Sequence, residues 1–415
     1  MTIGFWLNFC PTELKLTFEK PQISSCLPVV QSLHHYSASL TSLDLEFRDI
    51  ETELPDVKQC VADTLKSLCN LARISADGSI IFSPSVWVCL AQLPRLERVF
   101  SLRDMKRSNL IGEVRPSDWL GLPDLVAPFP SLHDLQAVAP CWLATIILTE
   151  YPLDHLRELG LLLQDAPDDS RDEFSVHVRL PQAISRFKDL TTLCLVTPHW
   201  SFPILDLHLP PDLNFLCICT MDSGSIGNDD FRKLCAAVPN LECLILMPSD
   251  ISLDDKSPRL TLEAIRLIGD VCPRLTWATL YVDTDVSSFQ WSHDDAPFPS
   301  HPLGVLSFVG TPIDDYFEVA AYLCTLFPDP EDSPDIEVAT LHFNHDFDWK
   351  GPVYAFDEDR GRSWDEVVHA MDMLRKRIIP SFRKRLEVKD AEIVKVREEL
   401  RRALAGNLSG EGLDC

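Results

Sequence analysis

Residues that could perform chemistry are few in this chain, and the densest group is His342-Phe-Asn-His345-Asp346-Phe-Asp348. Two histidines and a carboxylate can bind a metal ion, so a metal-assisted hydrolase built on His342, His345 and Asp346 is one hypothesis. The two histidines fall on or just past an expected strand, where their odd spacing places the side chains on opposite faces. An exposed strand end is therefore the preferred interpretation, and we expect no metal site.

The cysteines are a second source of reactive groups. Cys217 and Cys219 form a C-x-C pair, but no second pair stands at zinc-binding spacing, and the 14 cysteines are scattered over apolar positions. Reduced, mostly buried thiols are the expected state. The sequence has no Walker A loop, no G-x-G-x-x-G, no G-x-S-x-G and no H-E-x-x-H, so we expect no enzyme, no catalytic residue and no cofactor.

An irregular repeat, L-x-x-Φ-x-Φ with Φ apolar, organises most of the sequence. Successive repeats are 23 to 36 residues apart, and the clearest copy is Leu190-Thr-Thr-Leu193-Cys-Leu195. The Φ-x-Φ step has a period of two, so it predicts a short strand with its apolar residues on one face. The residues that open the repeats are Leu40, Leu71, Leu96, Leu132, Leu156, Leu190, Leu213, Leu241, Leu275, Leu303 and Ile336.

Helices are expected between the strands. Six prolines stand two residues before an opener, and proline ends helices and avoids central strands, so each marks a helix-to-strand turn. Apolar residues at helical spacing follow a polar or proline start at four places. These starts are Ser83-Pro84, Asn228-Asp229, Thr261 and Asp314-Asp315, and the prolines are Pro94, Pro130, Pro211, Pro239, Pro273 and Pro334.

The recurring helix, turn and strand resembles the leucine-rich-repeat superfamily, in its helix-bearing, ribonuclease-inhibitor-like class. Val271-Cys-Pro-Arg-Leu275 and Ala237-Val-Pro-Asn-Leu-Glu-Cys-Leu244 carry the resemblance, which covers roughly residues 30–345. The resemblance implies an α/β solenoid, a curved horseshoe with a parallel sheet on its concave side and helices on its convex side. The sequence beyond the repeats adds C-terminal helices to this fold. In its long acidic insertions and terminal basic helix, the whole chain is similar to F-box-associated repeat proteins of fungi.

An F-box is not recognisable at the N-terminus. Cys10-Pro11-Thr12-Glu13-Leu14 resembles an F-box opening, yet Leu14, Leu16 and Phe18 alternate as in a strand, and Pro21 and Pro28 should interrupt a helix. We expect residues 1–30 to form a cap or a partial repeat. The F-box is therefore either lost or lies upstream of this chain, and an adaptor of a cullin ligase is an uncertain partner.

The expected organisation is a solenoid over residues 31–345, an acidic loop over 346–362, a helical segment over 363–405 and a disordered tail over 406–415. Ser363 opens a capping box, and Pro380 should break the helical segment. Beyond Pro380, Leu386, Ile393 and Leu400 recur every seven residues, with Phe382, Val396 and Ala403 on a second seam that Lys389 interrupts. This seam is marginal for a coiled coil, so we expect a cap or a partly free helix in a monomer.

The net charge of −26 disfavours binding to nucleic acid. Residues 375–402 depart from it, with eleven basic and five acidic residues, whereas acidic clusters fill the loops around Asp165–Glu173, Asp254-Asp255, Asp294-Asp295, Asp329–Asp335 and Asp357–Asp359. No leader or membrane-length apolar run is present, which favours the cytoplasm or nucleus and no membrane partner.

The x positions of the strands predict a binding surface on the concave face. N-terminal strands place polar residues there, including Ser42, Asp44, Arg73, Arg98, Asp134, Gln136 and Glu158. Later strands place apolar residues there, which favours a protein-binding patch unless the Ser287–His301 insertion or the C-terminal tail covers it. The patch comprises Phe215, Cys217, Cys219, Cys243, Ile245, Met247, Trp277, Tyr281, Val305 and Val309.

The leading functional hypothesis is a scaffold that binds a protein or peptide through this patch. The resemblance implies a substrate-receptor-like component of an SCF-type ubiquitin ligase, or a relic of one. An alternative is a ribonuclease-inhibitor-like protein whose acidic loops capture a basic partner, and the hydrolase is the third hypothesis.

Overall fold

Twelve parallel strands form one sheet in the computed structural model, and they lie in the order of the sequence. The described residues are 11–19, 23–48, 55–102, 119, 127–164, 173–197, 204–220, 225–248, 258–288, 301–308, 313, 315–327, 334–337 and 358–408. The strands are β1 (Glu13–Glu19), β2 (Ser42–Arg48), β3 (Arg73–Asp77), β4 (Arg98–Leu102), β5 (Asp134–Pro140), β6 (Glu158–Gln164), β7 (Thr192–Thr197), β8 (Phe215–Thr220), β9 (Cys243–Met247), β10 (Trp277–Leu280), β11 (Val305–Phe308) and β12 (Asp335–Glu337).

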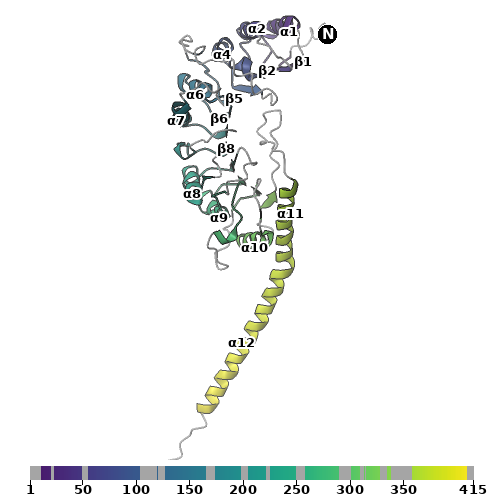
Figure 1. Cartoon of the computed structure of the whole chain (residues 1–415), viewed down its shortest axis with the longest axis vertical. Helices are drawn as coiled ribbons and strands as arrows, with labels where there is room; N and C mark the ends of the chain where they lie inside the picture. The colour runs from purple at the N-terminus through teal and green to yellow at the C-terminus, as the bar shows by residue number, and fades with distance from the viewer. Residues whose placement is uncertain are drawn as a thin grey trace, which may run out of the picture. The chain divides into compact units, whose positions relative to one another are not determined.

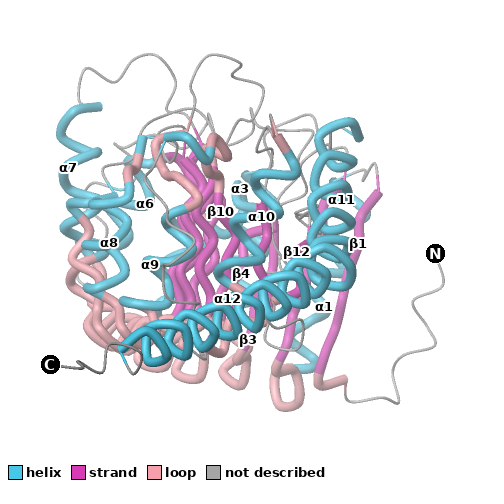
Figure 2. The backbone as a smooth tube through the Cα atoms, turned by 90° about the horizontal axis from the view of Figure 1, so that it is seen from below, coloured by secondary structure: helices cyan, strands magenta, loops and turns pink. Residues whose placement is uncertain are grey.

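The chain divides into two compact units, and the first contains the whole sheet. Its helices lie along one side of the arc of strands in Figure 1, and Figure 2 shows the strands side by side. This is an open, solenoid-like α/β arrangement. The helices are α1 (Ile23–Ser32), α2 (Pro55–Leu65), α3 (Gly78–Ile81), α4 (Pro84–Ala91), α6 (Cys141–Glu150), α7 (Glu173–Ile184), α8 (Asn228–Ala237) and α9 (Glu263–Val271), with 3-10 turns η2 (Leu33–Tyr36) and η4 (Ile204–Asp206).

The repeat openers are buried beside the strand starts. Ten of the eleven predicted openers stand two residues before a strand, and each is at most 4% exposed. Ile336 is the exception, because it lies inside β12 and pairs in register with Leu306, a core position. The prediction of Ile336 as an opener is therefore wrong, and Pro334 directly precedes β12 instead of lying two residues before an opener.

A ladder of shared carbonyls fixes the register of the repeats. The residue after an opener accepts two backbone hydrogen bonds from the following repeat at nine openers, and the Thr12 carbonyl likewise accepts from Thr41 and Ser42 at 2.8 and 3.0 Å. Thr276 and Trp277 repeat the pattern on Glu242 at 2.8 and 3.1 Å. Since the same geometry recurs at ten carbonyls from Thr12 to Thr276, the strands start level with one another across the sheet.

The first repeat extends further toward the N-terminus than expected. β1 pairs with β2 over seven residues, which confirms the strand predicted from Leu14, Leu16 and Phe18. α1 follows and contains Pro28, so the expectation that Pro28 interrupts a helix is wrong. A proline removes one backbone hydrogen bond and can bend a helix without ending it. Pro21 lies outside the described residues.

The four helix starts expected from the sequence each lie within two residues of the start of a helix in the structure. The capping interactions differ from one helix to another. α4 follows Ser83 with Pro84 at its first position, but the Ser83 hydroxyl makes no cap bond. Asp315 does cap α10 (Tyr316–Leu326), because its Oδ1 accepts from the backbone amides of Phe317 and Glu318 at 2.9 and 3.0 Å. α9 starts beside Thr261, whose hydroxyl accepts the Glu263 amide at 3.3 Å.

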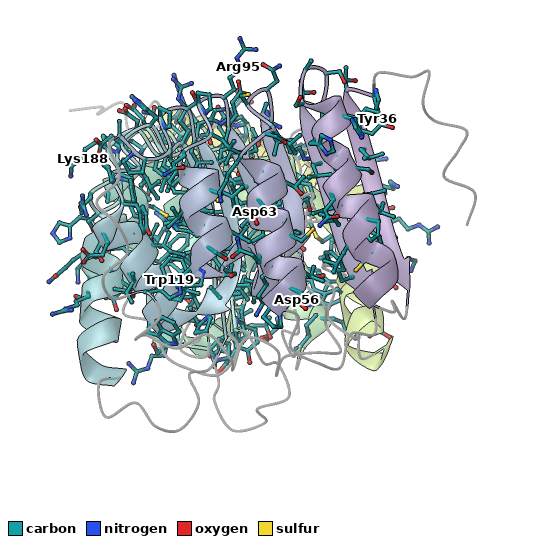
Figure 3. All side chains as sticks on the ribbon, turned by 90° about the horizontal axis from the view of Figure 1, so that it is seen from above. Tyr36, Asp56, Asp63, Arg95, Trp119 and Lys188 are labelled. Atoms are coloured by element: carbon teal, nitrogen blue, oxygen red, sulfur yellow. The ribbon has the colours of Figure 1, made fainter. Side chains whose placement is uncertain are left out.

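An aromatic cluster fills the first unit between α4 and the following repeat. Trp87 is fully buried, and its ring centroid lies 4.8 to 6.0 Å from four other rings. Figure 3 shows the labelled Trp119 among packed side chains, whereas Arg95 and Lys188 extend from the edge of the unit. The cluster thus anchors several repeats at one point. Its members are Phe82, Trp87, Trp119, Phe129 and Tyr151.

The second unit is helical and comprises η6 (Val286–Ser288), α10, α11 (Glu358–Met373), a π-helical turn η7 (Leu374–Ile378) and α12 (Ile379–Leu408) among the described residues. Trp364, Val367 and Met371 of α11 are buried, and Arg375 donates to the Phe327 carbonyl at 2.6 Å. α10, whose start we predicted as part of the repeats, therefore groups with the C-terminal helices.

Three predictions for the C-terminal segment are wrong. α11 begins at Glu358, so Ser363 lies inside the helix instead of capping it, and the loop predicted over 346–362 ends earlier. Pro380 does not break the segment either, because η7 precedes it and α12 continues through it. The Ile379 amide donates to the Leu374 carbonyl five residues back, and such a wider turn relieves the crowding that proline causes in an α-helix.

Candidate functional site

The first residues of the strands form a continuous row across the sheet. They are in register from β1 to β12, and they share the face that alternation turns away from the helix side; we call this the inner face. The row is charged or polar from β1 to β7 and apolar from β8 to β11, and its last member is the acidic Asp335. Its members are Glu13, Ser42, Arg73, Arg98, Asp134, Glu158, Thr192, Phe215, Cys243, Trp277, Val305 and Asp335.

A buried carboxyl lies in the charged half of the row. Asp134 is 3% exposed, between Arg98 on β4 and Glu158 on β6. Burial, reinforced by the negative charge of Glu158, raises the pKa of Asp134 to about 7, although Gln136 and the charges of Arg98 and Arg73 oppose the rise. Asp134 therefore carries its proton part of the time at neutral pH and can donate a hydrogen bond.

Gln136 and Arg73 complete this polar group. Gln136 Nε2 donates to Asp134 Oδ1 at 3.3 Å, while the buried Gln136 Oε1 has no hydrogen-bond partner among the described atoms. The exposed Arg73 guanidinium lies 4.8 Å from the centre of the Phe100 ring, a cation–π contact. Two exposed arginines beside a partly protonated carboxyl make a surface that suits an acidic or hydrogen-bonding partner.

The apolar half of the inner face is more deeply buried than a binding patch should be. Cys217, Cys219, Ile245 and Met247 are 0–5% exposed and pack in one cluster with residues of the preceding strands. These four residues cannot be contacted from outside, so their assignment to an accessible surface is wrong. The third and fifth residues of these strands are buried on the inner face, where they form a second hydrophobic core. The other members are Val138, Leu162, Cys194 and Val196.

Of the described residues of the predicted patch, the strand-start residues and Tyr281 remain accessible. Trp277 is 38% exposed, and Phe215, Cys243 and Val305 are half-buried. The Trp277 indole Nε1 donates to the buried Thr279 hydroxyl at 2.9 Å, which fixes the ring orientation on the surface. Tyr281 is half-buried just beyond β10, and Val309 lies outside the described residues. The accessible apolar site is therefore a row and not a broad patch.

Three thiols meet inside the second core. Cys194 pairs in register with Cys217, and the Sγ atoms of Cys217 and Cys219 lie 3.8 Å apart. Burial raises the pKa of Cys194, and a hydrogen bond with Cys217 raises that of Cys219, whereas bonds from both neighbours lower the pKa of Cys217. Cys217 is thus the most readily ionised of the three. We did not predict that Cys194 joins the pair, although alignment of the repeats at Leu190 and Leu213 contains that information.

The cysteine pattern does not produce a metal site in the described part of the chain. No group of three or more histidines, cysteines or carboxylates there has an arrangement that could hold a metal ion, and no described cysteine forms a disulfide. The hydrolase candidates His342, His345 and Asp346 lie outside the described residues, as do most of the acidic clusters.

Comparisons with protein-family models and with curated protein sequences return no match for this chain. Among the described helices, none combines the length and the hydrophobicity of a membrane span. The function is therefore inferred from the strand-start row.

Proposed function

We propose that this chain is a non-catalytic leucine-rich-repeat scaffold that binds a protein or peptide along the strand-start row. The leucine openers, the shared carbonyls and the in-register parallel strands support the leucine-rich-repeat class, because stacking of one unit on the next is how such repeats bury their cores. Repeat arrays of this kind commonly recognise partners on the face that the strands line.

The proposal depends mainly on the exposure and the fixed orientation of the Trp277 ring. Its indole is held by Thr279 and stays exposed, flanked in register by the half-buried Cys243 and Val305. Tryptophan is the residue type most enriched in the energetic centres of protein interfaces, and a ring held in one orientation loses less entropy when a partner binds. The resemblance to F-box-associated proteins suggests that the partner is a substrate of a ubiquitin ligase.

Affinity capture followed by titration of the recovered partner tests this role. Trp277→Ala is expected to weaken the complex about 10- to 30-fold, since loss of a central aromatic anchor costs about 2 kcal/mol. Phe317→Ala is the matched control, because Phe317 is also an exposed aromatic residue but lies on α10 in the helical unit. Equal affinities for wild type and Trp277→Ala would contradict the proposal.

The dependence of binding on salt concentration distinguishes this proposal from the alternative in which acidic loops bind a basic protein. Binding centred on an apolar row should persist when the salt concentration rises from about 0.15 to 1 M, over which the Debye length falls from about 8 to 3 Å. A complex that dissociates over this range but tolerates Trp277→Ala would instead support the acidic-loop alternative.

A further inference from the structure

An apolar seam is exposed on α12, the last helix of the chain. Ile393, Val396 and Leu400 are each at least half exposed, although burial of such side chains is favourable by about 1.5–3 kcal/mol each. The preceding helix behaves differently, because α11 buries Trp364 and Val367 within its own unit. Among the described residues, the second unit thus buries the apolar face of α11 but leaves the apolar face of α12 exposed.

The three residues occupy heptad core positions. Ile393 and Leu400 are seven residues apart, at position a, and Val396 stands three residues after Ile393, at position d. Lys389, one heptad before Val396, is the charged exception at d. The seam therefore has the pattern of a short coiled coil with a modest core.

The charges beside the seam specify the orientation of a partner helix. In a parallel pair, the residue at g of one helix faces the residue at e of the next heptad in the other. Glu392 is at g and Arg397 is at e, and both are exposed. A second copy of the same helix, aligned in parallel, would therefore form the pair Glu392–Arg397 twice, once on each side of the seam.

An antiparallel pair is less complementary. In that arrangement positions g face positions g and positions e face positions e, so the repulsion of Glu392 and Glu399 would offset the attraction of Asp390 and Arg397. Within a single helix, Glu392 and Arg397 are five residues apart and do not face each other, since neighbours on a helix surface are three or four residues apart. Glu392 and Arg397 can therefore pair with each other only between two helices.

We propose that α12 is a dimerisation helix that forms a parallel coiled coil with a second copy of this chain. Two chains would then present two strand-start rows joined by one stalk, which raises the effective affinity for a partner with two binding sites. The short seam and Lys389 make the association weak and dependent on concentration.

Sedimentation of the full chain over a range of concentrations tests the dimer. The weight-average mass of wild type should rise from 46.9 kDa toward twice that value. Val396→Glu should keep the mass at that of the monomer, because it buries a charge in the seam. Val394→Glu is the matched control, since Val394 is 58% exposed against 60% for Val396 but lies at position b. A wild type that stays monomeric, or equal effects of the two variants, would overturn the proposal.

Charge reversal tests the parallel orientation separately. Glu392→Arg and Arg397→Glu should each weaken dimerisation severalfold, and the double variant should recover most of the loss because the pair is restored with its signs exchanged. Circular dichroism of each variant monitors the helix itself. Failure of the double variant to recover, with helicity intact, would exclude the parallel geometry.

Discussion

Replacing Trp87 with alanine is expected to lower the free energy of unfolding by about 3–5 kcal/mol, the usual cost of removing a buried large aromatic side chain. Trp87 is fully buried, and it lies nearest to Phe129, with ring centroids 4.8 Å apart. Tyr151 meets its edge at 5.9 Å with the rings 85° apart, a favourable aromatic geometry. An alanine would leave a cavity bounded by parts of several repeats, which none of them could fill by moving alone.

Urea denaturation followed by circular dichroism measures this loss. Trp277→Ala provides the control, because the same chemical change at a site 38% exposed should cost about 1 kcal/mol or less. The comparison separates burial from residue type. Similar midpoints for the two variants would show that the aromatic cluster does not hold the first unit together.

Asp134→Asn is expected to stabilise the protein at pH 8, by on the order of 2–4 kcal/mol. The folded pKa of Asp134 is about 7, above the ordinary value of 3.8, so the native state binds the proton more tightly than the unfolded state does. Stability should therefore be unaffected by this group below about pH 4, fall as the pH rises from about 4 to 7, and level off above that. An uncharged amide removes the cost of burying the charge.

Unfolding free energies measured from pH 4 to pH 8 test this slope. The difference between Asp134→Asn and wild type should grow with pH through that window. Asp63→Asn serves as the control of opposite sign, because hydrogen bonds from Gln59 and Lys66 hold the pKa of Asp63 below its usual value. Its removal should slightly reduce stability at neutral pH. If the free energy of unfolding of the wild type rose between pH 5 and 7 in parallel with that of Asp134→Asn, the result would contradict burial of this carboxyl in an unfavourable site.

Local spacing in the sequence is enough to predict the repeats but not all of their helices. The Φ-x-Φ period located the sheet because each strand carries its own signal, as in Leu193 and Leu195 of β7. α6 carries no such signal, since Cys141–Glu150 is apolar on nearly every side and has no amphipathic stripe. Ile336 was misplaced because the last strand has no leucine at the opener position, and terminal repeats commonly differ from internal ones.

The sequence predicts on which face of the sheet the side chains of the candidate site lie, but not whether they are exposed to solvent. Alternation along a strand correctly put Cys217 and Met247 on the face of Trp277, yet whether that face meets water depends on contacts from distant parts of the chain. The pKa of Asp134 has the same origin, because Arg98 and Glu158 become its neighbours only through the register of adjacent strands. Such information is not contained in the spacing of one repeat.

The ladder of shared carbonyls also determines how the first unit should respond to force. Each repeat is tied to its two neighbours by bonds that run along the stack, as from Ser42 to Thr12 and from Trp277 to Glu242, while β1 and β12 have one neighbour each. Tension applied to the ends of such a stack would act on all interfaces between repeats with the same force, because they are in series, so the interfaces should break one at a time. The sheet would then behave as an extensible spring that lengthens in steps of one repeat, starting from its terminal strands.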